Sequence, residues 1–276
     1  MPIVIAATPI GNDKDATPRL KEYIENADVI AAEDTRRFFA LASRLGVDVD
    51  AKVLSFYEHN EKGRIEQLIS VSEDKTVLVV SDAGMPSISD PGFSLVNECV
   101  SRDVDVTVVP GPSAVLTALV ASGLPSDRFT FEGFFPRKEK DVRSVCEDVL
   151  DEKRTMIFFE SPRRLGKTSR VCADVFGKER QGAVCRELTK IHEEVVRAPL
   201  GELAERFCDG ALGEIVVVIA GAHEIRSYNA CDISADVIKD VEDLRALGVR
   251  LKDACGYVAV RHNVKKKELY DYMCSQ

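Results

Sequence analysis

Residues 78–92 read LVVSDAGMPSISDPG, an apolar run that changes abruptly into a loop of Ser, Asp, Gly and Pro. The run Leu78-Val79-Val80 is typical of a buried β-strand, and the turn formers end it. A loop so rich in turn formers and carboxylates is costly to order, so a ligand or a chemical step should need it. The stretch therefore predicts a buried strand followed by a binding loop.

Short apolar, β-branched runs recur along the chain and alternate with stretches of helical periodicity. The helical patterns include PRLKEYIENA (18–27), EKGRIEQLISVSE (61–73) and GFSLVNECVSR (92–102). The expected strands are Ile3–Thr8, Val29–Glu33, Val53–Tyr57, Thr76–Ser81, Val104–Val109, Phe129–Glu132, Thr155–Glu160, Gly182–Glu187 and Ile215–Ala220. This alternation predicts α/β layering with a largely parallel sheet.

Each of the first five expected strands ends in an unusual loop. The loops are TPIGN (8–12), EDTRR (33–37), YEHNE (57–61), SDAGMPSISDPG (81–92) and PGPSA (110–114). The carboxyl ends of parallel strands meet at one edge of a sheet, where ligands bind. The five loops together therefore predict a binding cleft.

The α/β pattern restarts after PGPSAVLTALVASGLPSDRF (110–129), and an exposed polar segment, FFPRKEKD (134–141), lies near the boundary. The last part of the chain holds no expected strand and is typical of short helices. There Ser234 and Asp236 are candidate N-caps, and Gly248 is a candidate C-terminal cap. We expect domains at 1–114, 115–223 and 224–276.

Composition and charge exclude several classes of protein. A chain with 45% hydrophobic and 30% charged residues is a globular protein, and no apolar run is long enough to span a membrane. The start of the chain lacks the basic segment of a signal peptide, so we expect a cytoplasmic protein. The eight cysteines are scattered singly, which favours a reducing compartment and argues against a metal site. The net charge of −9 argues against non-specific coating of nucleic acid, although six basic residues lie within 248–267.

The common nucleotide-binding and hydrolase motifs do not fit. No G-x-G-x-x-G follows the first expected strand, and no G-x-S-x-G occurs. SPRRLGKTS (161–169) contains the Gly-Lys-Thr of a P-loop, but Ser161 stands where its first glycine would fall and Pro162 removes an amide. We interpret it as a loop whose basic residues are solvated or contact an anionic substrate. His59 is interpreted as a hydrogen-bonded loop residue.

Seven motifs occur in order along nearly the whole chain. They are ATPIGN with ADVIAAEDTR, FYEHNE, VSDAGMPSISDPG, VVPGPSA, FEGFFPRK, FFESPRR and CRELTKIHEE. Together they resemble the tetrapyrrole-methylase-like (class III) S-adenosylmethionine methyltransferases. AEDTR, FYEHNE and RELTK distinguish the members that modify ribosomal RNA from porphyrin or diphthine methylases.

The resemblance implies methyl transfer from S-adenosylmethionine to the ribose 2′-hydroxyl of one cytidine in 16S rRNA of the small ribosomal subunit. It implies a homodimer without a metal or membrane contact. The implied fold has two α/β domains of the tetrapyrrole methylase type, a cofactor cleft between them, and a small C-terminal helix-turn-helix-like domain. One alternative is a methylase of a small tetrapyrrole, and another is a non-catalytic nucleotide-binding or ribosome-associated module.

The family's cofactor pocket can be carried over residue by residue. The implied cofactor-binding residues are Pro9, Ile10, Asp82, Ala83, Gly84, Ile88, Ser113, Ala114, Phe159 and Ile215. Asp82 is expected to contact the cofactor, and Asp90 to act as a helix N-cap. Met85 and Ser87 depart from the Thr and Gly of the family pattern, which could alter one cofactor contact.

Charged residues on the cleft edge supply the candidates for catalysis and RNA binding. The catalytic candidates are Glu33, Asp34, Arg36, Arg186, Glu187 and Lys190. EDTRR (33–37) pairs carboxylates with arginines, which suits either a base with an orienting partner or a structural ion-pair network, and the sequence leaves both open. The RNA-binding candidates are Arg163, Arg164, Arg250, Lys252, Arg261, Lys265, Lys266 and Lys267. For the tail residues, a solvated helix face is the alternative.

Overall fold

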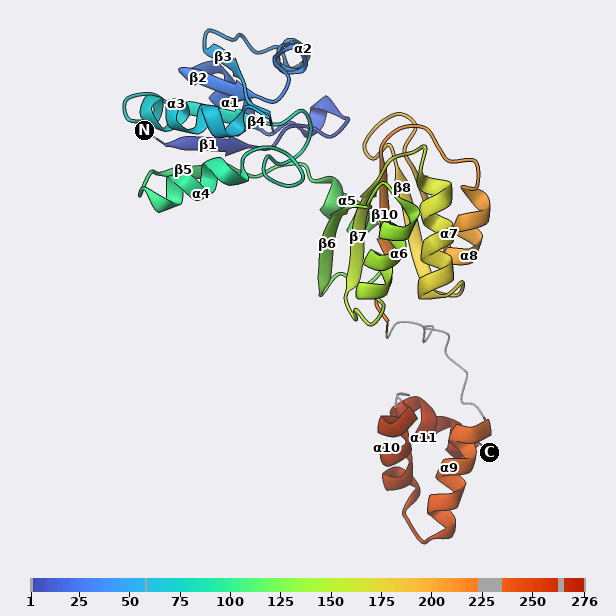
Figure 1. Cartoon of the computed structure of the whole chain (residues 1–276). Helices are drawn as coiled ribbons and strands as arrows, with labels where there is room; N and C mark the ends of the chain where they lie inside the picture. The colour runs from blue at the N-terminus through green and yellow to red at the C-terminus, as the bar shows by residue number, and fades with distance from the viewer. Residues whose placement is uncertain (1, 58, 223–234, 263–265, 276) are drawn as a thin grey trace. The chain divides into compact units, whose positions relative to one another are not determined.

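The computed structural model describes residues 2–57, 59–222, 235–262 and 266–275. The chain divides into two compact units, Met1–Ile225 and Arg226–Gln276. The first unit contains two five-stranded sheets with their helices, and the described part of the second unit is helical (Figure 1).

The first sheet is entirely parallel, with the strand order β3-β2-β4-β1-β5. Its strands are β1 (Ile3–Ala6), β2 (Val29–Ala32), β3 (Lys52–Ser55), β4 (Val77–Val80) and β5 (Val106–Val109). Its helices are η1 (Asp13–Asp15), α1 (Pro18–Asn26), α2 (Thr35–Leu45), α3 (Glu61–Ser72) and α4 (Phe93–Ser101). The five carboxyl ends therefore share one edge, as the sequence predicted.

Alternate residues of these strands pack into two separate hydrophobic cores, because successive side chains of a strand point to opposite faces of the sheet. Val4 and Ile30 pack in a cluster with residues of α1 and α2. Ile3 and Val29 pack in a cluster with residues of α3 and α4. Helices on both faces explain why the strands read as continuous apolar runs.

The second sheet is mixed, with the strand order β6-β7-β10-β8-β9. Its strands are β6 (Phe129–Phe134), β7 (Thr155–Glu160), β8 (Gln181–Arg186), β9 (Glu194–Pro199) and β10 (Ile215–Ile219). Only the β6–β7 pair is parallel, so the expectation of a largely parallel sheet is wrong here. The short connection from β8 to β9 permits only an antiparallel pair, since parallel neighbours need a long crossover. β9 was not expected from the sequence.

Helices cover both faces of the second sheet. They are α5 (Ala114–Ser122), α6 (Glu139–Asp148), α7 (Leu165–Phe176) and α8 (Leu200–Arg206). α6, α7 and α8 lie on one face of the sheet (Figure 1), and their residues share one core with it. Residues of α5 share another core with Ile10, which comes from the loop after β1. Ile10 therefore links the first sheet and its helices (the first α/β layer) to the second sheet and its helices (the second α/β layer).

The tail unit contains α9 (Ala235–Ala246), α10 (Leu251–His262) and α11 (Lys266–Ser275). Val237, Val241, Val258 and Leu269 belong to a small core of its own. Asp236 lies in the first turn of α9, so its prediction as an N-cap is wrong, and Ser234 lies outside the described residues. Gly248 has a φ of 87°, the left-handed conformation expected of a residue that ends a helix.

Candidate active site

A cavity of about 350 Å³ lies at the carboxyl edge of the first sheet and is closed by the second α/β layer. Its volume falls in the range of small-molecule sites. Its lining residues are Ile10, Ala83, Gly84, Met85, Ile88, Ser89, Asp90, Ser113, Ala114, Val115, Phe134, Phe159, Glu160, Ser161, Pro162, Gly213, Glu214, Ile215 and Val216. Eight of the ten cofactor-binding residues inferred from the family resemblance are in this set. Three of the five predicted loops, at 8–12, 81–92 and 110–114, contribute to the lining, and the described residues of the loops at 33–37 and 57–61 do not.

Pro9 and Asp82, the other two, line a neighbouring depression together with Arg37 and Arg44. The Asp82 carboxylate is occupied there: it accepts a hydrogen bond from the Asp34 amide at 3.1 Å and pairs with Arg37 at 3.0 Å. It therefore supports the start of α2. Asp90 shows the reverse: the N-cap of α4 is Gly92, so the predicted capping role of Asp90 is wrong, and its side chain belongs to the cavity lining.

Gly84 shapes the loop in a way that the sequence did not reveal. Its amide donates to the Thr8 carbonyl at 3.1 Å and its carbonyl accepts from the Thr8 amide at 2.9 Å. Its φ of 82° favours glycine. Glycine is therefore needed at 84 for the bend that joins two carboxyl-edge loops.

The carboxylates of the cavity lining differ in their partners. Glu160 is buried and paired with Arg164 at 2.6 Å, and it accepts a hydrogen bond from the Thr168 hydroxyl. Glu214 is paired with Lys190 at 3.1 Å. Among the described lining residues, Asp90 is the carboxylate without an ion pair, and the lining contains neither Lys nor Arg.

Two carboxyls at this edge have raised pKa values. Burial, the Glu33 charge and the Asp82 charge raise the pKa of Asp90 to about 6, although a hydrogen bond with Ser81 opposes the rise. Burial is also the main cause that raises the pKa of Glu33, whose Oε2 accepts the Asp82 amide at 3.1 Å. Neighbouring carboxyls with raised pKa values favour a cationic ligand, because its positive charge stabilises their ionised forms.

Aromatic and aliphatic side chains form the wall from the second α/β layer. The register of the β6–β7 pair shifts between Phe131 and Phe134, where Gly133 has a φ of 74°. Phe134 is 58% exposed and packs edge-to-face on Phe159, with ring centroids 5.2 Å apart. Together with Ile215, the two rings, which are inclined at 65° to each other, form an apolar wall that a planar group can pack against. The sequence analysis did not predict Phe134 as a site residue. The available signal was its position in the motif FEGFFPRK.

The remaining predicted catalytic residues lie in ion pairs. The Asp34 carboxylate caps α2 and binds Arg36 at 2.7 Å, and the Arg36 hydrogen bond keeps the pKa of Asp34 well below its usual range. Arg186 pairs with Glu194 at 3.1 Å, and Lys190 pairs with Glu187 at 2.8 Å. Of the two alternatives left open by the sequence, these contacts favour the structural ion-pair network.

The loop after β8 connects the two α/β layers. The Asn12 amide donates to the Thr189 hydroxyl at 3.1 Å. A side chain at Gly11 would meet Lys190 Cγ at 2.4 Å, so the two loops are in close contact. Glu187 and Thr189 both have positive φ, a strain that surrounding contacts must offset. RELTK (186–190) therefore holds the loops of the two sheets together beside the cavity, without contributing to its lining.

Some of the RNA-binding candidates are exposed side chains, and others are held by hydrogen bonds or ion pairs. Arg163 is exposed, whereas Arg164 is held by Glu160 and donates to the Pro136 carbonyl at 2.8 Å. In the tail, Arg250, Lys252 and Lys266 are exposed, and Arg261 lies 3.9 Å from Asp240. Lys265 and the Lys267 side chain lie outside the described residues.

The Gly-Lys-Thr of SPRRLGKTS lies in the first turn of α7 and does not form a phosphate loop. A Cβ at Gly166 would come within 2.5 Å of the Phe207 and Cys208 carbonyl oxygens. Glycine is present because α7 packs closely against the end of α8. In the described part of the chain, no group of His, Cys, Asp or Glu side chains could hold a metal ion. Within those same residues, no helix has the length and apolarity needed to cross a membrane.

Comparison with known families agrees with this architecture. The sequence profile described as Tetrapyrrole (Corrin/Porphyrin) Methylases matches residues 2–204. Diphthine synthase is similar in structure, with a TM-score of 0.59, 17% identity and coverage of 79% of this chain and 90% of that chain. A Thermus thermophilus uroporphyrin-III C-methyltransferase complexed with S-adenosylhomocysteine gives a TM-score of 0.53 at 17% identity, with coverage of 81% and 97%. The chain therefore belongs to the tetrapyrrole methylase family.

Comparison with individual proteins shows to which group within the tetrapyrrole methylase family the chain belongs. The chain is 47% identical to ribosomal RNA small subunit methyltransferase I of Mycobacterium tuberculosis, over 98% of this chain and 93% of the relative. It is 39% identical to the protein of the same name from Escherichia coli O157:H7, over 99% and 95%. The chain belongs to the ribosomal RNA small subunit methyltransferase I family, which confirms the resemblance carried by the seven motifs.

Proposed function

We propose that the protein transfers a methyl group from S-adenosylmethionine to the ribose 2′-hydroxyl of one cytidine in 16S rRNA of the small ribosomal subunit. The observation that supports this most directly is the cavity with its unpaired Asp90, set in a chain closely related to ribosomal RNA methyltransferases. A ribosomal substrate implies a cytoplasmic enzyme.

The cavity residues fit the cofactor. Phe159, Phe134 and Ile215 suit the adenine ring, and the small side chains of Ser113 and Ala114 leave room for the ribose. Asp90 suits the positive charge of the molecule, because no Lys or Arg in the lining competes for its carboxylate.

When bound, the cofactor supplies an electrophilic methyl group. The chain's own residues hold the reactants in line, which can contribute roughly 7–11 kcal/mol toward the rate. Of the six catalytic candidates, Glu33 is the one that fits a proton acceptor: burial raises its pKa, and it forms no ion pair with another described residue. A positioned base adds about 10²–10⁴-fold.

The test is incubation of the protein with methyl-labelled S-adenosylmethionine and either 30S particles or uroporphyrinogen. Label in one cytidine of 16S rRNA, found at the 2′-oxygen by nucleoside mass spectrometry, supports the proposal. Label on a base, or in the tetrapyrrole alone, refutes it.

We also propose that two copies associate through α4, β5 and α5. β5 is an edge strand with Val108 exposed, and Phe93, Val100 and Val120 are each more than 70% exposed. Edge strands and exposed apolar surface of this kind are normally covered. A second copy would cover them, and Val120→Glu should convert the dimer into a monomer in sedimentation analysis. A wild-type monomer at micromolar concentration would contradict this.

A further inference from the structure

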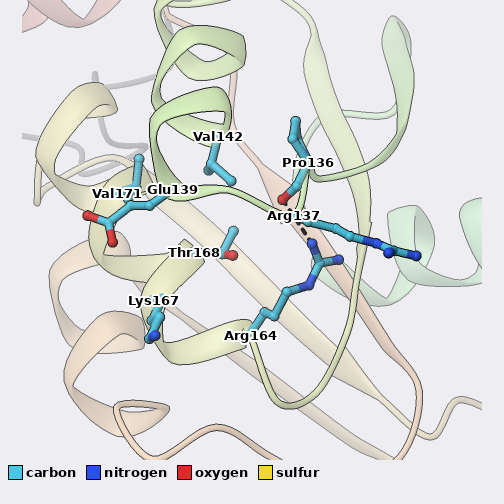
Figure 2. A pocket seen from close by; sticks show the side chains of 8 residues that line it. All are labelled: Pro136, Arg137, Glu139, Val142, Arg164, Lys167, Thr168 and Val171. Carbon is cyan, nitrogen blue, oxygen red and sulfur yellow. Dashed lines mark hydrogen bonds between the residues drawn. The ribbon is translucent and has the colours of Figure 1, made fainter.

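Five cations gather where α6 and α7 begin. We call them the α6–α7 basic patch: Arg137, Lys138, Lys140, Arg163 and Lys167. All five are exposed. Figure 2 shows Arg137 and Lys167 on opposite sides of a notch that is also lined by Arg164 and Glu139. The notch has a volume of about 40 Å³, enough for a few water molecules, so a binding partner of these cations must lie outside it.

The patch differs from most of the charged surface because its cations are free. Within the described residues, none of the five forms an ion pair, whereas neighbouring Arg143 pairs with Asp174 at 3.4 Å. Glu139 and Asp141 lie beside the patch, in the first turn of α6. There they face the positive end of the helix dipole, which stabilises them without a cation. An acidic protein of net charge −9 thus keeps an unpaired basic surface.

Arg164 makes this surface rigid. Its guanidinium donates to the Phe135 carbonyl at 3.2 Å and to the Pro136 carbonyl at 2.8 Å (Figure 2), and it also pairs with the buried Glu160 at 2.6 Å. These contacts fasten the loop that carries Arg137 to the end of β7. A preorganised cluster of cations binds a polyanion with less loss of conformational entropy.

The patch also adjoins the cavity. Phe134 lines the cavity and Pro136 lines the notch, so a single residue separates the two surfaces on this loop. On the other loop, Ser161 and Pro162 line the cavity and Arg163 follows directly. A strand that places one nucleotide in the cavity would therefore pass over the patch.

We propose that the α6–α7 basic patch binds the phosphodiester backbone of the RNA segment that carries the methylated nucleotide. This inference rests on the proposed function. Phosphate contacts position a nucleic acid without reading its sequence, which matches a set of free Lys and Arg side chains beside a cavity that receives one nucleotide.

The test compares two double variants of the full-length protein with the same change in charge. Arg137→Gln with Lys167→Gln removes two patch cations. Lys52→Gln with Lys75→Gln removes two exposed cations at the amino ends of β3 and β4, the opposite edge of the first sheet. The readouts are KM for 30S particles across a salt series, kcat, and calorimetric binding of S-adenosylmethionine.

The patch variant should raise KM for 30S particles roughly tenfold at low salt and reduce the salt slope by about 1.4–1.8 units, because each of the two lost phosphate contacts contributes about 0.7–0.9. Its kcat and cofactor affinity should stay at the wild-type values, and the control variant should match wild type throughout. An unchanged KM and slope in the patch variant would overturn the inference. A defect confined to intact particles and absent with protein-free 16S rRNA would also overturn it, in favour of a ribosomal protein as partner. A wild-type protein that methylates neither substrate would refute the proposed function itself.

Discussion

The substitution Asp90→Asn tests two effects of the Asp90 carboxylate: the destabilisation of the folded, cofactor-free protein and the binding of the cofactor. Burial, Glu33 and Asp82 raise the pKa of Asp90 from 3.8 to about 6, so the folded protein prefers the protonated carboxyl. This preference costs nothing below about pH 4, where the carboxyl is protonated in both the folded and unfolded states. The cost grows as the pH rises and is complete above about pH 6.

The magnitude follows from the shift of about two pKa units. At about 1.4 kcal/mol per unit the upper limit is roughly 3 kcal/mol, and partial solvent access reduces it to about 1–3 kcal/mol. Asp90→Asn removes the charge and keeps the shape. The cofactor-free variant should therefore unfold at higher urea than wild type at pH 8, and at the same urea concentration at pH 4.

The same substitution should weaken the binding of S-adenosylmethionine. Loss of a charge-assisted contact costs about 1.5–3 kcal/mol, which corresponds to roughly a 10- to 100-fold loss of affinity. S-adenosylhomocysteine lacks the sulfonium charge and should lose less. Wild-type affinity should fall as the pH drops below about 6, because Asp90 takes up a proton, and the variant should lose this dependence.

Calorimetry between pH 5 and 8, with urea unfolding at the same pH values, measures both effects. Asp74→Asn is the control, since Asp74 is exposed and follows α3. A variant that is no more stable at pH 8 would show that the carboxylate is not strained in the empty cavity. Unchanged affinity for the cofactor would show that Asp90 does not meet its charge.

Three further predictions concern single structural features. Ser87→Gly should raise the free energy of unfolding by about 1–2 kcal/mol in thermal or urea unfolding, because Ser87 has a φ of 73° and a buried hydroxyl without a hydrogen-bond partner; a destabilised variant would contradict this reading. Gly166→Ala should destabilise the protein by at least about 2 kcal/mol, since its Cβ would lie 2.5 Å from two backbone oxygens of the α8 end, whereas Gly63→Ala, with open space at its Cβ, should not. Removal of residues 226–276 should leave cofactor binding intact and weaken binding to 30S particles, because α9–α11 have their own core; loss of cofactor binding would mean that the tail supports the cavity.

The local pattern of residues determined most of the first α/β layer. Its five strands are short β-branched runs followed by turn formers, and helices on both faces make such runs parallel and buried. In the second sheet the same apolar runs led to the wrong prediction of parallel strands. A strand buried on both faces has the same apolar pattern whether its neighbours run parallel or antiparallel to it. β9 was missed because its residues are only partly buried at the edge of the sheet, which weakens the apolar pattern.

The sequence by itself determined the family, the carboxyl-edge loops and most of the cavity wall, because strand-end loops of one parallel sheet must meet at one edge. The tertiary structure decided which charged groups are free. Asp82 and Arg164 differ little in sequence context from Asp90 and Arg163, but the first two are held by Arg37 and Glu160. Asp90 and Arg163 face the cavity and the solvent without an ion pair among the described residues. Pairing depends on distances of a few ångströms, which for Arg37 and Asp82 join residues 45 positions apart in the chain, and only the folded chain sets those distances.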